Sequence, residues 1–290
     1  MILNPGSGSE TDEDARRREI VDLFAAHGRT ATIFAASEVS PIGDQARAAV
    51  EAGCRLAVAA GGDGTVNAVA STALEAGIPM AVLPVGTLNH FAKDLGLPLE
   101  LPDAIRVAAQ GAVRRVDVGE VNGRLFLNNS SIGVYPRIVE LRNRYGGRGR
   151  AKWLAALWAS LTVLRRRPFL GVRISAEGDV VVRRTPFVFV GNNEYRMVGL
   201  NAGSRESLTG GRLALYVMHA SRRRGLLSLG WRVLWKGAER VDELELFKVE
   251  WADIETRRGR LQVALDGEVV VLQAPLRYRS RPAALQVVAA

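Results

Sequence analysis

The chain has 290 residues, of which 48% are hydrophobic and 24% are charged, a balance typical of globular enzymes long enough for two domains. Its single cysteine, Cys54, excludes a disulfide within the chain, and the longest apolar helical stretch, Trp153–Leu164, is shorter than the roughly twenty residues that cross a bilayer. The net charge of +9 is uneven, because residues 1–114 contain nine Lys and Arg against fourteen Asp and Glu, whereas residues 115–290 contain thirty against sixteen.

Strand and helix signals alternate through residues 1–114. They fall at Met1–Leu3, Asp12–Ala26, Thr30–Ala35, Gly43–Glu51, Leu56–Ala60, Val66–Ala76, Met80–Pro84, Leu88–Asp94 and Pro102–Gln110. This alternation predicts an N-terminal α/β domain with a mostly parallel sheet and helices on both faces. The first of these strands is very short.

The second half of the chain, residues 115–290, has the pattern of an antiparallel domain. A pair of strands surrounds an Asn122-Gly123 turn within residues 115–127, and further strands are expected at Gly171–Ala176, Val180–Arg184, Pro186–Val190, Arg212–Met218, Lys248–Ile254, Leu261–Leu265 and Val269–Gln273. We predict a β-sandwich. Two inserted helices, Arg150–Arg167 and Arg222–Lys236, have basic ends and aromatic-rich apolar faces that suit either the sandwich core or a membrane interface.

Two glycine-rich turns each follow an apolar strand and open a helix. They read Gly61-Gly62-Asp63-Gly64-Thr65 and Gly86-Thr87-Leu88-Asn89. A helix joins the two strands, so both turns are expected at the carboxyl ends of strands in one parallel sheet, where α/β proteins bind ligands. Exposed backbone N–H groups at helix N-termini favour phosphate, and an aspartate among them is explained by Mg²⁺ between carboxylate and phosphate oxygens.

These turns also carry a family resemblance. Together with Asn4-Pro5-Gly6-Ser7-Gly8, the run Pro84–Gly96 and Asp266-Gly267-Glu268, they resemble the diacylglycerol kinase catalytic-domain family. Within that family the chain is most similar to soluble bacterial lipid kinases related to sphingosine and ceramide kinases. The first turn alone is shared with NAD kinases and phosphofructokinases. The resemblance covers essentially the whole chain and implies a first domain of that fold, to which a last strand at about residues 284–289 returns.

The resemblance also implies roles for individual residues, with ATP and Mg²⁺ as the cofactors. Asp63 would reach the catalytic Mg²⁺ directly or through water or ATP, Asp266 would accept the proton of the lipid hydroxyl, and Glu268 would support metal or orientation. Nucleotide contacts are assigned to Asn4, Ser7, Gly61, Gly62, Gly64, Thr65, Gly86, Thr87, Asn89 and Lys93. From the residues alone, however, Asp266-Gly267 between two strands is also an ordinary hairpin turn.

One family feature is missing. Many bacterial relatives bind a structural Mg²⁺ through an Asp-Asp-Gly-x-Leu turn, where this chain has Thr209-Gly210-Gly211-Arg212-Leu213. The segment has no carboxylate and carries a cation, so we expect the accessory Mg²⁺ site to be absent.

The sequence therefore predicts an ATP-dependent lipid kinase, cytoplasmic and peripherally associated with the inner face of the membrane. The basic second half favours an anionic membrane surface as partner, and no zinc spacing or helix-turn-helix pattern suggests nucleic acid. Two alternatives stay open, a soluble kinase like NAD kinase and a catalytically silent lipid-binding or regulatory protein. Neither the acceptor lipid nor the oligomeric state is readable from the sequence.

Overall fold

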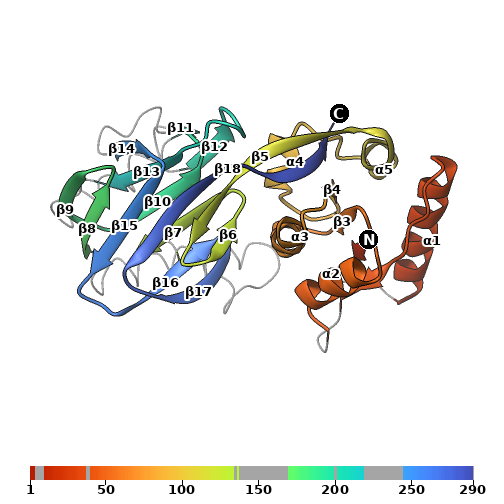
Figure 1. The fold of residues 1–290 in the computed structure, drawn as a ribbon, viewed down its shortest axis with the longest axis horizontal. Helices are drawn as coiled ribbons and strands as arrows, with labels where there is room; N and C mark the ends of the chain where they lie inside the picture. Colours follow the sequence, from red (N-terminus) through yellow and green to blue (C-terminus); the bar gives the residue numbers. More distant parts are fainter. Residues whose placement is uncertain are drawn as a thin grey trace, which may run out of the picture. The chain divides into compact units, whose positions relative to one another are not determined.

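The computed structural model describes residues 1–3, 10–36, 40–133, 136, 169–198, 201–218 and 244–289 (Figure 1). The chain divides into two compact units. Unit 1 comprises Met1–Asp117 with Ala283–Ala290, and unit 2 comprises Val118–Pro282. The division falls within two long strands, β5 (Ala112–Val121) and β18 (Leu276–Ala289).

Unit 1 is an α/β domain built on a parallel sheet. Its strands lie in the order β2-β1-β3-β4, and the end of β18 joins β4 in parallel through the pair Val287 and Met80. The elements are β1 (Ile2–Leu3), α1 (Glu10–Ala26), β2 (Phe34–Ala35), α2 (Ile42–Glu51), β3 (Ala57–Ala60), α3 (Asp63–Ala76), β4 (Met80–Leu83), α4 (His90–Asp94) and α5 (Leu101–Gln110). The predicted fold class of this half is confirmed.

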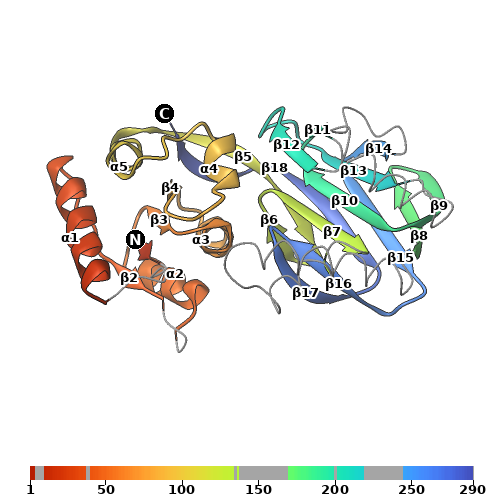
Figure 2. The ribbon, with the colours of Figure 1, turned by 180° about the vertical axis from the view of Figure 1, so that it is seen from behind.

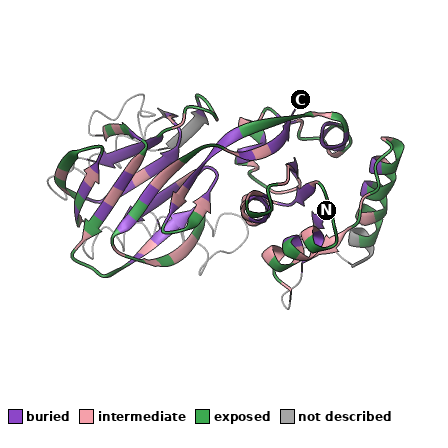
Figure 3. Cartoon of the chain, in the orientation of Figure 1, coloured by how far each residue is buried: buried purple, intermediate pink, exposed green. Residues whose placement is uncertain are grey.

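Helices cover both faces of the unit 1 sheet. On one face, α1 and α5 pack together, and Phe24 and Ile105 share a buried cluster with Val58 and Leu83 of the strands (Figures 1 and 2). On the other face, α2 packs against α3. Because both faces are covered, every residue of β3 and β4 is buried, which explains why these strands are continuous apolar runs (Figure 3).

Unit 2 contains two antiparallel layers, as predicted. One sheet has the order β14-β13-β10-β7-β16-β17, and the other layer contains β18, β15, β8 and β9, with β5 and β6 attached. Its strands are β6 (Arg124–Phe126), β7 (Asn129–Gly133), β8 (Leu170–Ala176), β9 (Asp179–Thr185), β10 (Phe187–Asn192), β13 (Leu213–Met218), β14 (Leu244–Val249), β15 (Trp251–Thr256), β16 (Arg260–Leu265) and β17 (Glu268–Gln273). A hairpin of β11 (Tyr195–Val198) and β12 (Asn201–Arg205) forms a separate small sheet.

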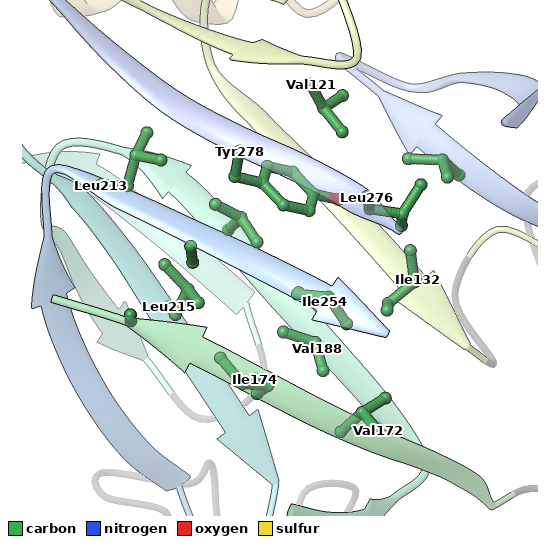
Figure 4. Close-up of a cluster of buried hydrophobic side chains, with 14 of the residues drawn as sticks. Val121, Ile132, Val172, Ile174, Val188, Leu213, Leu215, Ile254, Leu276 and Tyr278 are labelled. Atoms are coloured by element: carbon green, nitrogen blue, oxygen red, sulfur yellow. The ribbon is translucent and has the colours of Figure 1, made fainter. Parts of the chain in front are cut away.

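The core of unit 2 lies between its two layers. Ile132 and Val188 of one sheet pack in the same buried cluster as Ile174, Ile254 and Tyr278 of the other (Figure 4). The phenol oxygen of Tyr278 lies 3.0 Å from Ser130 Oγ, and burial raises the pKa of this tyrosine well above its ordinary value. The phenol is therefore neutral and acts as a hydrogen-bonding group inside an apolar core.

None of the described helices combines the length and hydropathy that crossing a bilayer requires.

Candidate functional site

The first glycine turn lies where β3 passes into α3. Gly61 is buried, and a Cβ built on it would stand 2.4 Å from Thr65 Oγ1, so the side chain of Thr65 occupies the space beside this glycine. Gly62 is the N-cap of α3, in extended conformation, and Asp63 begins the helix. The turn thus places the N-terminus of a 14-residue helix beside these glycines, and a helix N-terminus favours anions.

The second glycine turn is held together by Asn89. This residue adopts a left-handed conformation, with φ of 53°, and its amide nitrogen donates to the carbonyls of Pro84 at 3.0 Å and Gly86 at 2.8 Å. Its Oδ1 accepts the N–H of Gly86 at 3.1 Å. The side chain predicted to contact nucleotide therefore makes its hydrogen bonds inside the turn, while Thr87 and Lys93 are exposed.

The two turns touch each other. A Cβ on Gly86 would stand 2.4 Å from Gly62 Cα and 2.9 Å from Gly62 N, so the backbones meet at these two glycines. In addition, Asp63 Oδ1 accepts the N–H of Phe91 at 3.4 Å, which links the start of α3 to the start of α4. Helix α3 connects the parallel strands β3 and β4, so both turns lie at the same end of the sheet, as the sequence predicted.

The contact between Gly62 and Gly86 leads to a prediction about stability. Gly86→Ala places a methyl group against backbone atoms that cannot rotate away, and we expect a loss of about 1–3 kcal/mol in the free energy of unfolding. The matched control is Gly43→Ala in α2, where the nearest atoms are 4.0 Å from the added Cβ and helix propensity favours alanine. Chemical denaturation of both variants measures the difference, and equal stability would contradict the packing described.

The residues of these turns fit a magnesium–phosphate ligand better than a metal held by protein alone. In the described part of the chain no three His, Cys, Asp or Glu side chains are grouped to hold a metal ion. Asp63 is half-buried, as are the two glycines on either side of it, Gly62 and Gly64. A single carboxylate next to a phosphate-binding turn is the usual protein contribution to Mg²⁺ that is shared with a nucleotide.

A second candidate site surrounds Asp266 in unit 2. Asp266 and Gly267 form the two-residue turn between β16 and β17, with φ angles of 47° and 90° and with Leu265 paired to Glu268. Positive φ at both positions is the signature of a type I′ hairpin turn. Glu268 is exposed on the strand that follows.

The carboxylate of Asp266 is fixed by backbone donors. Its oxygens accept the N–H groups of Leu127 at 2.7 Å, Asn128 at 2.8 Å and Asn129 at 2.9 Å, and its own N–H donates to the Asn129 carbonyl at 2.9 Å. Three successive amides directed at one carboxylate hold it in a single orientation. The side chain therefore also anchors the hairpin to the segment 127–129, which follows β6.

Arg205 holds the same segment from its carbonyl side. Its guanidinium donates to the Leu127 carbonyl at 2.6 Å and to Asn128 Oδ1 at 3.2 Å, and it lies over the ring of Tyr195. Asn192 Nδ2 donates to the same Leu127 carbonyl at 2.9 Å. The sequence did not single out Arg205, because nothing in its neighbourhood distinguishes it from the other arginines of this basic half.

The buried position of Arg205 leads to a second prediction. Arg205→Met removes the donors to Leu127 and Asn128 while keeping an unbranched apolar stem, and we expect a loss of about 1–3 kcal/mol of stability. Arg260→Met, on an exposed position of β16, is the matched control and should change stability by less than about 0.5 kcal/mol. Thermal unfolding distinguishes the two, and equal shifts would mean that the contacts of Arg205 carry no net stability.

In the segment Thr209–Leu213, where we expect no accessory metal site, Arg212 contacts neighbouring residues. Arg212 Nη1 donates to the Lys248 carbonyl at 3.2 Å, and the guanidinium lies 3.8 Å from carboxylates of both Glu177 and Glu250. A cation of the protein itself thus lies among these acidic groups.

Several predicted features lie outside the described residues. They are Asn4 and Ser7 of the first nucleotide loop and the two basic, aromatic-rich helices at Arg150–Arg167 and Arg222–Lys236.

Comparison with protein families matches the two halves of the chain separately. Residues 1–121 match the diacylglycerol kinase catalytic domain, which includes both glycine turns. Residues 130–289 match the YegS C-terminal NAD kinase beta sandwich-like domain, which includes Arg205 and Asp266.

Individual relatives give the same result. A protein of Pseudomonas savastanoi named "probable lipid kinase YegS-like" is 30% identical over 253 residues, covering 82% of this chain and 77% of the relative. The diacylglycerol kinase of Bacillus subtilis is 36% identical over 147 residues, covering 49% of this chain and 46% of the relative. A crystal structure of a diacylglycerol kinase from Bacillus anthracis shares the fold, with a TM-score of 0.70 at 22% identity, covering 100% of this chain and 95% of that one.

Proposed function

Since this chain belongs to the lipid kinase family in which a diacylglycerol kinase catalytic domain precedes a YegS-type β-sandwich domain, we propose that it transfers the γ-phosphoryl group of ATP to the hydroxyl of a membrane lipid such as diacylglycerol. The observation that carries the proposal is the contact between the two glycine turns at Gly62 and Gly86, with Asp63 beside them. Phosphoryl transfer depends mainly on positioning and charge neutralisation, and two turns in contact would hold the phosphates in position.

The nucleotide phosphates are assigned to the turns of unit 1. Backbone N–H groups of Gly61, Gly62 and Gly64 would bind phosphate oxygens at the N-terminus of α3. Asp63 would hold Mg²⁺, which when bound neutralises phosphate charge. The exposed ammonium group of Lys93 is available for the transferred phosphoryl group, and Asn89 supports the second turn from within.

The lipid hydroxyl is assigned to Asp266 of unit 2. The three backbone donors orient its carboxylate, and a carboxylate that accepts the hydroxyl proton would promote attack on the γ-phosphorus. Glu268 would support orientation from the next strand. The basic charge of residues 115–290 would draw this half of the chain to an anionic membrane surface at the inner face of the membrane.

The decisive experiment uses the full chain with γ-labelled ATP and Mg²⁺. Separate tubes contain vesicles of phosphatidylglycerol, alone or with diacylglycerol, ceramide or a sphingoid base, and one tube contains NAD without lipid. We expect label in one lipid. Label in NAD would instead identify a soluble kinase, and the absence of transfer while ATP binding is retained would support a regulatory lipid-binding protein.

A further inference from the structure

One end of unit 2 is formed by three segments that contain arginine but no acidic residue. They are residues 256–260 between β15 and β16, residues 273–277 between β17 and β18, and residues 122–124 between β5 and β6. Their arginines are all exposed, and we call this group the arginine end: Arg124, Arg257, Arg258, Arg260 and Arg277.

Hydrogen bonds hold the three segments of the arginine end together. The N–H of Ala274 donates to the Gly259 carbonyl at 3.0 Å. The amide nitrogen of Asn122 donates to the Gln273 carbonyl at 2.8 Å, and its Oδ1 accepts the N–H of Arg277 at 2.7 Å. The five arginines therefore come from distant parts of the sequence but lie at one end of the sandwich.

The guanidinium groups of the arginine end lack the partners that other arginines of unit 2 have. Arg173 lies 3.9 Å from Glu255, and Arg279 lies 2.7 Å from Asp253. Within the described part of the chain, by contrast, none of the five side chains of the arginine end forms a hydrogen bond or an ion pair. The positive charge at this end is therefore not neutralised by neighbouring carboxylates.

An exposed apolar side chain lies beside these arginines. Val271 of β17 is 62% exposed, whereas the residues on either side of it pack against the core. Gln273 is opposite Arg260 of β16, so Val271 is the diagonal neighbour of Arg260 on the outer face of the sheet. Cations around an apolar side chain are typical of surfaces that lie at the boundary between lipid headgroups and acyl chains.

We propose that unit 2 docks through the arginine end on a bilayer that contains anionic phospholipid, with the guanidinium groups at the lipid phosphates and Val271 at the level of the headgroups. Guanidinium groups bind phosphate through paired N–H donors, which suits them to this contact. The inference deepens the proposed function, because it assigns the membrane contact to one place, but docking itself requires neither ATP nor phosphoryl transfer.

The arginine end is separate from Asp266. Arg260 begins β16 and Asp266 follows the last residue of that strand, so the two positions are about 20 Å apart along the strand. A docked bilayer would therefore contact Asp266 only when β16 lies along the membrane surface. Because of the same separation, substitutions in the arginine end leave the backbone contacts of Asp266 unchanged.

Sedimentation with vesicles tests the proposal on the full chain, without ATP. The vesicles contain phosphatidylcholine, alone or with phosphatidylglycerol, at one salt concentration. One double variant carries Arg257→Gln and Arg258→Gln. The matched control carries Arg173→Gln and Arg281→Gln, which are exposed arginines of unit 2 that lie near carboxylates. Both variants lose two positive charges, and the turn keeps the hydrogen bonds of Thr256 Oγ1 to the backbone of residue 258.

We expect the unchanged chain to sediment with phosphatidylglycerol vesicles and not with phosphatidylcholine alone. Arg257→Gln with Arg258→Gln should weaken this binding by about 25-fold, roughly fivefold for each arginine at an anionic surface. The control should weaken it much less, because salt screens charges that lie away from the membrane.

Three outcomes would overturn the proposal. They are equal weakening by the two variants, binding that does not depend on phosphatidylglycerol, and a larger loss of binding to a DNA duplex than to vesicles, which would make the arginine end a nucleic-acid surface. Since the assay contains no ATP, its failure leaves the proposed transfer reaction untouched, and a failure of that reaction leaves the docking result standing.

A fluorophore tests the depth of Val271. Val271→Cys in a Cys54→Ala background is labelled with an environment-sensitive dye, and Val180→Cys of β9, which is 53% exposed, is the matched control. The Arg183–Glu245 ion pair links β9 to β14, which lies at the opposite edge of the sheet from β17. Phosphatidylglycerol vesicles should shift the emission of the dye to shorter wavelength at residue 271 alone. Equal shifts at both positions, or none at 271, would contradict docking through the arginine end.

Discussion

Asp266→Asn should lower the rate of phosphoryl transfer to lipid by about 100-fold or more, the range that a general base contributes. The substitution keeps the size of the side chain and an oxygen that can accept from Asn128 and Asn129. It places an amide donor against the N–H of Leu127, however, so some loss of stability, on the order of 1–3 kcal/mol, accompanies the chemical effect.

Arg205→Met separates the two effects. It loosens the same segment, 127–129, while the carboxylate of Asp266 is retained. We compare the transfer rates of both variants at saturating ATP and lipid, well below either Tm. A much larger loss of transfer rate in Asp266→Asn would support the role of the carboxylate as base. Equal losses of rate in two variants that are equally destabilised would mean that Asp266 only anchors the hairpin.

Asp63→Asn should lower phosphoryl transfer by on the order of 100-fold and raise the Mg²⁺ concentration needed for the residual activity. The amide oxygen can still accept from Phe91 N–H, so the link between α3 and α4 is retained and only the negative charge is lost. The measurement is the transfer rate as a function of Mg²⁺ concentration at fixed ATP.

A matched control comes from α5. Asp103 is likewise an acidic residue in the first turn of its helix, and it is exposed. Asp103→Asn should cost about 0.3–1 kcal/mol of helix-dipole stabilisation and leave transfer unchanged. An Asp63→Asn variant as active as this control would rule out the assignment of Asp63 to the metal.

The parallel sheet and its glycine turns could be predicted because their signals are local. Apolar runs closed by glycine fix β3 and β4, and one connecting helix brings the turns to the same end of the sheet. The role of Asn89 could not be predicted from the sequence. Whether an amide faces a ligand or its own turn depends on a left-handed backbone angle that the sequence does not report.

Strand β7 and the contacts around it were missed for a different reason. Asn129, Ser130 and Ser131 have the composition of a loop, yet they form a central strand between β10 and β16. Ser130 is buried because the hydroxyl of Tyr278, about 150 residues later, provides its hydrogen-bond partner. Arg205 and Asp266 converge on residues 127–129 in the same long-range manner, and no local pattern indicates such partners.

The return of β18 to unit 1 has a consequence for synthesis of the protein. Leu285, Val287 and Val288 are buried in unit 1, yet they are translated after all of unit 2. Until they emerge from the ribosome, β4 has an open edge of unpaired N–H and C=O groups, the kind of edge that recruits other strands. The N-terminal domain therefore cannot complete its sheet during translation, and an isolated 1–117 fragment should aggregate unless residues 283–289 are supplied.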